Sequence, residues 1–340
     1  MKLGIIGLPG SGKSTIFEAL TQSILPEGHK GENRIGTIQV PDKRVAVLSK
    51  MHKPKKTIYA RVEYFLPGMM RQKRDKKIWN QARDCDALIH VIRNFGVYGF
   101  EKPKPYHDFQ AMNQELILAD LVVVEKKLEN VELDRRRDKK TSPEELSLLN
   151  QCLKNLENEI PLRRFPDLAS AHNLRGYAFL SAKPMLVMFN NEDEDDSIPE
   201  AADLTSREDC TVIRGKLEQE LAQMSDEEAE EFLSEFNITA SAMDRVIKRS
   251  YELLGLVSFF TVVNDEVKAW TIKKETKAVD AAGSIHTDMQ KGFIRAEVIS
   301  CDDLMDAGTY HQARKKGNIR LEGKTYEVRD GDIITFRFNV

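Results

Sequence analysis

The chain has 340 residues, of which 41% are hydrophobic, and its formal net charge is −3. This length is enough for two or three packed domains, and the near-neutral charge excludes a global basic field that would attract nucleic acid or a membrane. The four cysteines are dispersed without a C-x-x-C pair, so we expect neither a disulfide framework nor a zinc site. No apolar run reaches about 18 residues, and the start MKLGIIG is too short for a signal peptide. We therefore expect a cytoplasmic protein without a membrane contact.

Strand-like and helix-like segments alternate through the first two thirds of the chain. Residues 3–6 form a short apolar run, a glycine-rich loop follows, and residues 13–21 carry apolar side chains at helical spacing. Further strand candidates are residues 61–65, 86–93, 185–189 and 210–213. Strands separated by helical segments predict an α/β fold with a parallel sheet covered by helices.

A charged helical stretch lies between the third and fourth of these strands. Residues 110–137 carry leucines and valines three or four positions apart, and Ser142-Pro-Glu-Glu is typical of the start of a second helix. Two helices joined by a polar turn predict an antiparallel hairpin. Its turn, DRRRDKK at residues 134–140, is either an ordinary solvated tip or a contact with RNA.

The pattern changes after about residue 258. Short strand-like runs such as FFTVV, EVKAW and IITFRF are separated by glycine and aspartate turns. We expect a compact C-terminal domain with several strands and few helices.

Residues 7–14, GLPGSGKS, match the phosphate-loop pattern G-x-x-x-x-G-K-[ST] in full. They follow an apolar strand and open a helix, which is the context that such a loop requires. Backbone N–H groups would surround the β-phosphate, Lys13 would reach the β- and γ-phosphates, and the Ser14 hydroxyl would bind Mg²⁺. The residues expected to bind nucleotide here are Gly7, Pro9, Gly10, Ser11, Gly12, Lys13, Ser14 and Thr15.

A candidate base-reading segment follows the strand at 185–189. Asn190-Asn-Glu-Asp193 is an N-x-x-D sequence in which Asn190 would face the purine and Asp193 would accept hydrogen bonds from guanine. Arg214 and Gly215, after the next strand, occupy the place of the last base-contacting loop. Two alternatives stay open: the acidic run at 192–196 is a solvated loop, or the chain is a small-molecule kinase.

Two other motifs are in the wrong order to serve this site. Ser181-Ala-Lys183 looks like a guanine-loop SAK but precedes the N-x-x-D strand. Asp280-Ala-Ala-Gly283 looks like a switch D-x-x-G but lies in the last domain. We expect neither to contact the nucleotide.

At this point the chain resembles the YchF family, an Obg-related branch of the P-loop NTPases. The resemblance rests on IHTDMQKGFIRAEVI (285–299), RLEGKTYEVRDGDIITFRFNV (320–340), RVIKRSYELLGLVSFFT (245–261) and NQELILADL (113–121). It implies a G domain at 1–109 and 180–257, an inserted helical hairpin at 110–179, and a β-grasp TGS domain at 258–340. It also implies Mg²⁺, a purine nucleotide and a ribosomal partner, without recognition of DNA sequence.

The nucleotide expected from this resemblance is ATP or GTP. In the best-known members of the family ATP is preferred and the base reader ends in Glu, whereas Asp193 stands here. A carboxylate at this place pairs well with guanine N1–H and N2–H. We therefore expect GTP to bind at least as well as ATP.

The switch regions depart from the family pattern. The place of the metal-holding aspartate falls on or near Leu66, although Glu63 is retained nearby. The place of the switch threonine falls near Lys30, and Thr37 is expected on a strand.

The family histidine near the γ-phosphate falls close to Tyr98, and the nearest substitute, His107, is out of register. Phosphoryl transfer depends on positioned charge and an oriented water. We therefore expect either slow, altered NTP hydrolysis or a regulatory nucleotide-binding module without turnover.

The partner surface is expected on the TGS domain and the hairpin tip. The cations that a β-grasp sheet could gather are Lys291, Arg295, Lys315, Lys316, Arg320 and Lys324. Together with residues 135–140 they could contact ribosomal or other RNA, with an attraction that falls as salt rises.

Overall fold

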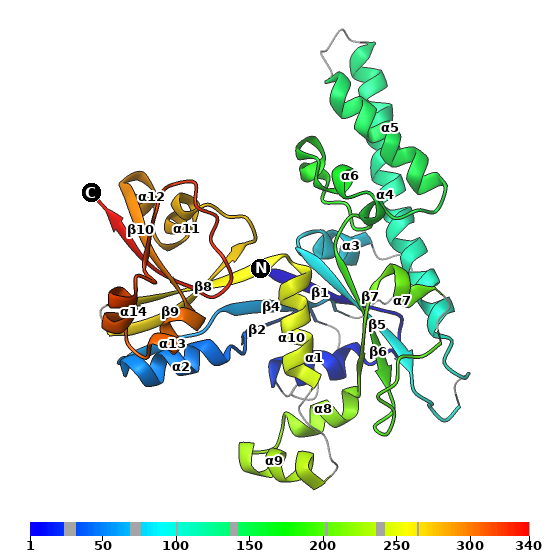
Figure 1. The fold of residues 1–340 in the computed structure, drawn as a ribbon. Coiled ribbons are helices and arrows are strands. Elements are labelled where there is room, and N and C mark those ends of the chain that lie inside the picture. The colour runs from blue at the N-terminus through cyan, green and yellow to red at the C-terminus, as the bar shows by residue number, and fades with distance from the viewer. Residues whose placement is uncertain are drawn as a thin grey trace. The chain divides into compact units, whose positions relative to one another are not determined.

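The computed structural model describes residues 1–23, 32–68, 76–99, 101–136, 142–200, 203–235, 242–263 and 265–339. The fold is shown in Figure 1. It contains two compact units, unit 1 with Met1–Thr37 and Glu63–Met243, and unit 2 with Ile38–Val62 and Asp244–Val340. The predicted limits of the G domain, hairpin and TGS domain stay a prediction.

The first sheet has the strand order β2-β4-β1-β5-β6-β7. Its strands are β1 (Lys2–Ile6), β2 (Arg34–Gln39), β4 (Arg61–Leu66), β5 (Ala87–Asn94), β6 (Met185–Asn191) and β7 (Asp209–Ile213). The strands β4, β1, β5, β6 and β7 pair in parallel. Every residue of β6 is buried, as a central parallel strand covered on both faces requires. The predicted α/β fold with a parallel sheet is confirmed.

The helices of unit 1 connect these strands. They are α1 (Lys13–Thr21), α3 (Lys76–Arg83), α4 (Pro105–Arg135), α5 (Pro143–Glu157), α6 (Pro166–Ser170), α7 (Leu204–Arg207), α8 (Gly215–Leu221) and α9 (Asp226–Glu235), with 3-10 turns at Leu162–Arg164 and His172–Tyr177. The helix α10 (Ala242–Leu253) begins at the boundary with unit 2.

The long helix α4 belongs to two cores. Near its start, Phe109, Met112 and Leu116 pack against the sheet, and farther along Val124 packs against α5 at Leu149. Figure 1 shows α4 and α5 side by side, extending away from the sheet. Ser142 caps α5 by accepting a hydrogen bond from the Glu145 amide. The predicted hairpin start is therefore present, whereas tip residues 137–141 lie outside the described part of the chain.

A buried carboxylate fixes the base of this hairpin. Asp120 on α4 accepts hydrogen bonds from the amides of Leu180 (3.0 Å) and Ser181 (2.7 Å) and from Arg83 of α3 (2.7 Å). Lys183 donates to the Arg83 carbonyl at 2.8 Å. The SAK sequence therefore joins the hairpin to the sheet instead of contacting a base.

Unit 2 is built on a mixed sheet of order β11-β10-β12-β8-β9-β3. Its strands are β3 (Lys56–Ile58), β8 (Leu256–Val263), β9 (Glu266–Lys273), β10 (Phe293–Ser300), β11 (Arg320–Glu322) and β12 (Asp332–Phe338). Its helices besides α10 are α2 (Lys43–His52), α11 (Ala278–Ile285), α12 (Thr287–Lys291), α13 (Cys301–Ala307) and α14 (Tyr310–Lys316).

The expectation of few helices in the C-terminal domain was wrong. The helices α11 to α14 have five to eight residues each, too few for an apolar period to be visible in the sequence. The D-x-x-G sequence at 280–283 lies within α11, so it forms no switch loop. No helix in the described residues is long and apolar enough to cross a membrane.

Candidate nucleotide site

The phosphate loop connects β1 to α1 at the carboxyl edge of the parallel sheet, where ligands of such folds bind. Gly10 and Gly12 have φ of 80° and 89°, a left-handed conformation that other residues rarely adopt. A Cβ on Gly12 would lie 2.2 Å from Asn190 Nδ2, whereas Gly10 has open space around it. The glycines thus allow both the turn and the close approach of a neighbouring strand end.

Lys13 lies in this loop with its ammonium group against the protein. Its Nζ donates to the Leu8 carbonyl at 2.7 Å, and burial lowers the pKa of Lys13 to about 8. A desolvated cation gains from an anion placed beside it. The Ser11 hydroxyl is also buried and has no hydrogen-bond partner among the described residues. Both features fit a phosphate group held by this loop.

Asn190 joins three segments of the site. Its Nδ2 donates to the Ser11 carbonyl at 3.1 Å, and its Oδ1 accepts from the Gly215 amide at 2.9 Å. A Cβ on Gly215 would lie 2.6 Å from Asn190 Oδ1, so a larger residue at this position would displace the Asn190 amide. The buried Asn190 amide therefore ties the phosphate loop to the loop after β7.

Asp193 lies at the start of the same loop system. One carboxylate oxygen, Oδ1, accepts from the Leu217 amide at 3.2 Å, and Arg214 donates to the Asp193 carbonyl at 3.4 Å. Asn191, which stands where a GTPase has lysine, is buried and hydrogen-bonded to Asn94 at 2.9 Å and to the Ser197 carbonyl at 2.7 Å. The Asn191 side chain thus holds together the ends of the neighbouring strands β5 and β6.

A cavity of about 600 Å³ adjoins these side chains. It is lined by Gly12, Thr15, Phe95, Gly96, Asn190, Asn191, Glu192, Asp193, Glu194, Lys216 and Gln219. Sequence reasoning missed Phe95 and Gly96, which follow the carboxyl end of β5. Glu192 holds this segment through its Oε1, which accepts from the Gly96 amide at 2.9 Å. Their position directly after an apolar strand of a predicted parallel sheet was the only available sequence signal.

The metal side of the site is less complete. Ser14 is exposed in the first turn of α1, where its hydroxyl fits one Mg²⁺ ligand position. Leu66 ends β4 and is buried, so the place predicted for the aspartate offers no oxygen. Glu63 is in register with Lys2, at the far end of β1 from the phosphate loop and roughly 10 Å along the strand from Leu66. The described residues contain no cluster of three His, Cys, Asp or Glu side chains that could hold a metal.

The remaining predicted switch residues are scattered. Thr37 lies on β2 and is exposed, as expected, and Tyr98 is fully exposed. His107 is exposed in the first turn of α4, with Nδ1 3.5 Å from Asp108. Lys30 and residues 69–75 of the shortened switch lie outside the described residues.

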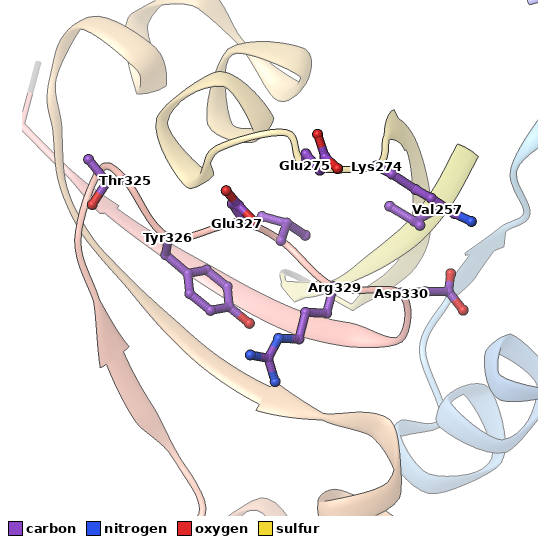
Figure 2. Close-up of a pocket in the computed structure, with 9 residues that line it drawn as sticks. Val257, Lys274, Glu275, Thr325, Tyr326, Glu327, Arg329 and Asp330 are labelled. Atoms are coloured by element: carbon purple, nitrogen blue, oxygen red, sulfur yellow. The ribbon is translucent and has the colours of Figure 1, made fainter. Parts of the chain in front are cut away.

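A second cavity, of about 500 Å³, lies in unit 2 (Figure 2). Its walls include Tyr326, Arg329, Glu275 and Glu327. Figure 2 shows Tyr326 and Arg329 pointing away from Glu275 and Glu327, so these side chains do not converge on one ligand group. The nucleotide site in unit 1 is the better candidate.

Comparison with known proteins identifies the family. The profile of the YchF-GTPase_C family, described as "Protein of unknown function (DUF933)", matches residues 256–339. The chain is 36% identical over 365 residues to "Ribosome-binding ATPase YchF" of Bacillus subtilis, covering 99% of each chain. This chain belongs to the YchF family.

Further relatives agree over the full length. The YchF protein of Escherichia coli O157:H7 is 35% identical, with 100% of this chain and 99% of the relative covered. The solved structure of the Schizosaccharomyces pombe YchF GTPase matches with a TM-score of 0.85 and 27% identity, over 99% of this chain and 97% of that chain. The resemblance to YchF proteins and the C-terminal TGS-like domain are thereby confirmed.

Proposed function

We propose that this YchF protein binds a purine nucleoside triphosphate with Mg²⁺, hydrolyses it slowly, and associates with ribosomes. The observation that carries the nucleotide part is the Asn190 amide, which bonds the phosphate loop at Ser11 and the last loop at Gly215. The loop proposed to hold the phosphates lines a cavity of about 600 Å³ through Gly12 and Thr15. A triphosphate with an attached purine needs both parts.

The phosphates would lie against the loop from Gly7 to Thr15, including Pro9. Backbone N–H groups and Lys13 would donate to them, and the positive end of the α1 dipole adds to the attraction. Mg²⁺, held by Ser14 and the phosphates, would neutralise charge on the transferred group. The described residues supply Ser14 to this ion, and Leu66 supplies no second ligand.

The base would enter the cavity between the Phe95 segment and Asp193. The Phe95 ring is close enough to Gly12 that a Cβ there would lie 3.9 Å from its Cε1, so an aromatic surface adjoins the phosphate loop. The Asn191 side chain is hydrogen-bonded to Asn94 and to the Ser197 carbonyl, so it would not reach over the base. The Phe95 ring would cover the purine plane instead. Asp193, together with Arg214 and Gly215, would set the preference between GTP and ATP, and we propose that GTP binds at least as well as ATP.

Slow hydrolysis is supported by the buried Leu66 and the exposed, unaligned His107. An enzyme with an incomplete set of charges retains binding better than turnover. The second candidate, a regulatory module without turnover, is favoured by the same residues. Release of γ-phosphate in a single turnover separates the two.

Ribosome association is proposed from the relatives, whose names describe ribosome-binding ATPases. The cationic residues of unit 2 support a contact with RNA phosphates.

The decisive experiment is calorimetric titration of ATP and GTP analogues into the parent and Lys13→Ala. Removing a charge-assisted contact costs about 1.5–3 kcal/mol, so the variant should bind about ten- to a hundredfold more weakly. Lys126→Ala, which removes an exposed lysine on α4, is the matched control and should bind like the parent. Equal affinity of parent and Lys13→Ala would refute the nucleotide site.

A further inference from the structure

Unit 2 places two arginines directly opposite each other on neighbouring strands. In the pairing of β10 with β12, Arg295 is the partner of Arg337. Directly opposite residues share one face of the sheet with side chains about 5 Å apart, and like charges there are destabilising. An anion placed between or above the two side chains would relieve this repulsion.

A buried carboxylate forms an ion pair with one of these two arginines and with a third arginine, from a neighbouring helix. Glu297, two residues after Arg295 and on the same face, forms ion pairs with Arg337 of β12 and with Arg314 of α14, the latter at 3.5 Å. The Tyr310 hydroxyl donates to the same carboxylate at 3.4 Å. The Glu297 side chain is 9% exposed, whereas Arg337 and Arg314 are 56% and 62% exposed. The carboxylate is thus covered while both guanidinium groups reach solvent.

The arginines on this face outnumber the one carboxylate with which they form ion pairs. Arg295 is exposed and forms no ion pair within the described residues, so one carboxylate faces three guanidinium groups. Lys315 and Lys316, exposed on α14, extend the positive surface beyond Arg314. Because Glu297 already orients Arg314 and Arg337, these side chains would lose less conformational entropy when they bind an anion.

The opposite face of the sheet is the core of unit 2. There Ala296, Val298 and Phe336 pack with Ala281 of α11. The predicted cations Lys291 and Lys324 belong to this side, because Lys291 ends α12 and the Lys324 carbonyl accepts from Val279 of α11 at 3.4 Å. The predicted set of cations is therefore divided between two faces.

We propose that Arg295, Arg314 and Arg337 form a binding site for the phosphate backbone of RNA. Planar guanidinium groups match phosphate oxygens bidentately, which is the commonest chemistry of such contacts. Leu321 is the partner of Glu297 on the same face and is 54% exposed, so an apolar surface for a ribose or base adjoins the charges. This inference rests on the ribosome association proposed above and assigns it to one face of unit 2.

The test compares two doubly substituted proteins that lose the same charge. Arg295→Gln with Arg337→Gln removes the opposed pair, and Lys291→Gln with Lys324→Gln is the matched control on the other face. Binding of each protein to purified bacterial ribosomes and to a fluorescent RNA hairpin is measured across a salt series. The arginine variant should weaken binding to both and reduce the slope of log K against log salt by about 2, one for each lost phosphate contact. The lysine variant should keep the parent slope.

Equal slopes for the two variants, or equal losses from both, would overturn the proposal. If the parent binds the RNA hairpin through these arginines but not ribosomes, the site stands and the ribosome association fails. If it binds neither, both fail. Arginine-dependent binding to phosphatidylglycerol vesicles or to a polyglutamate peptide, equal to that for RNA, would also contradict an RNA site. Arg295→Gln alone serves as a second variant, because Arg295 takes part in no described ion pair and its loss leaves the fold intact.

Discussion

At the scale of single residues, a backbone contact orients Asp193, the residue proposed to recognise the base. Its Oδ1 accepts from the Leu217 amide at 3.2 Å, which leaves Oδ2 for the proposed contact with the base. In Asp193→Asn the amide oxygen would keep the Leu217 contact, and the NH₂ group would take the place of Oδ2. A donor at this place fits the O2 carbonyl of xanthine and opposes the N2 amino group of guanine.

We therefore predict that Asp193→Asn loses GTP affinity and gains affinity for xanthosine triphosphate. Each change should amount to about 1–3 kcal/mol, as expected for a lost or gained hydrogen bond to a charged or buried group. Competition titration with GTP, ATP and xanthosine triphosphate measures it. A variant that loses all three nucleotides equally would remove Asp193 from base recognition.

His90 on β5 is a buried group that the nucleotide site does not use. Its ring stacks on Phe109 with centroids 5.7 Å apart, and both ring nitrogens lack a partner among the described residues. Burial, with the charges of Arg163 and Lys13, lowers the pKa of His90 from 6.5 to about 3. Between these values the unfolded chain binds a proton that the folded chain rejects, so stability falls as pH drops below about 6.5.

We predict that this histidine costs the protein about 2 kcal/mol of unfolding free energy on going from pH 7 to pH 5. His90→Leu should lose that much less stability over the same interval. Urea unfolding of both proteins at the two pH values measures the contribution of His90 to the change in unfolding free energy. The other titrating groups are the same in both proteins, so their contributions cancel. Identical pH dependence would mean that the pKa of His90 is the same in the folded protein and in the unfolded chain.

At the scale of elements, the local pattern located most strands of the first sheet. The runs predicted at 86–93 and 185–189 are β5 and β6, shifted or extended by one or two residues. Each is a continuous apolar run between polar turns, so its local sequence is sufficient to predict a buried strand. The start of α4 at Pro105 was placed five residues late, although proline in the first turn is a recognised start signal.

The local sequence pattern could not predict which strands pair when they lie far apart in the chain. Residues 43–52 and 56–58 form α2 and β3, and β3 pairs in parallel with β9 about two hundred residues later. A three-residue strand carries too few side chains to show a period, and nothing local names its partner. The cavity side chain Phe95 was missed for a related reason, since its role depends on which strand lies beside β5.

The Asp120 contact is an element-scale device that holds α4 to the sheet domain. Asp120→Ala would leave two buried amides without their acceptor and the mostly buried Arg83 without its counter-ion. We predict a loss of about 3–5 kcal/mol of unfolding free energy, the usual cost of breaking a buried charge pair. Glu125→Ala, on an exposed position of the same helix, is the control and should change stability by less than about 0.5 kcal/mol. Denaturant unfolding that gives equal values for the two variants would show that this contact is dispensable.

At the scale of the whole molecule, each unit has a core and a stabilising interaction of its own. Unit 1 packs around β5 and β6 and contains the nucleotide site, whereas unit 2 packs around β10 and β12. In unit 2, Arg44 of α2 donates to Asp330 at 2.7 Å and to Asp42 at 2.8 Å, which fixes the segment 38–62 to the C-terminal sheet. Large proteins of this kind commonly unfold in more than one step.

We predict two calorimetric transitions that respond to different changes. A nucleotide present at about a hundred times its Kd should stabilise unit 1 by about 2.7 kcal/mol and raise the midpoint of one transition only. Arg44→Met should reduce the unfolding free energy of unit 2 by about 1–3 kcal/mol, because two carboxylates lose a charged donor, and should lower the midpoint of the other transition. It should leave nucleotide affinity unchanged. Differential scanning calorimetry of both proteins, with and without nucleotide, gives the four midpoints. A single transition that shifts with either change would mean that the two cores unfold as one cooperative unit, so that nucleotide bound in unit 1 also stabilises unit 2.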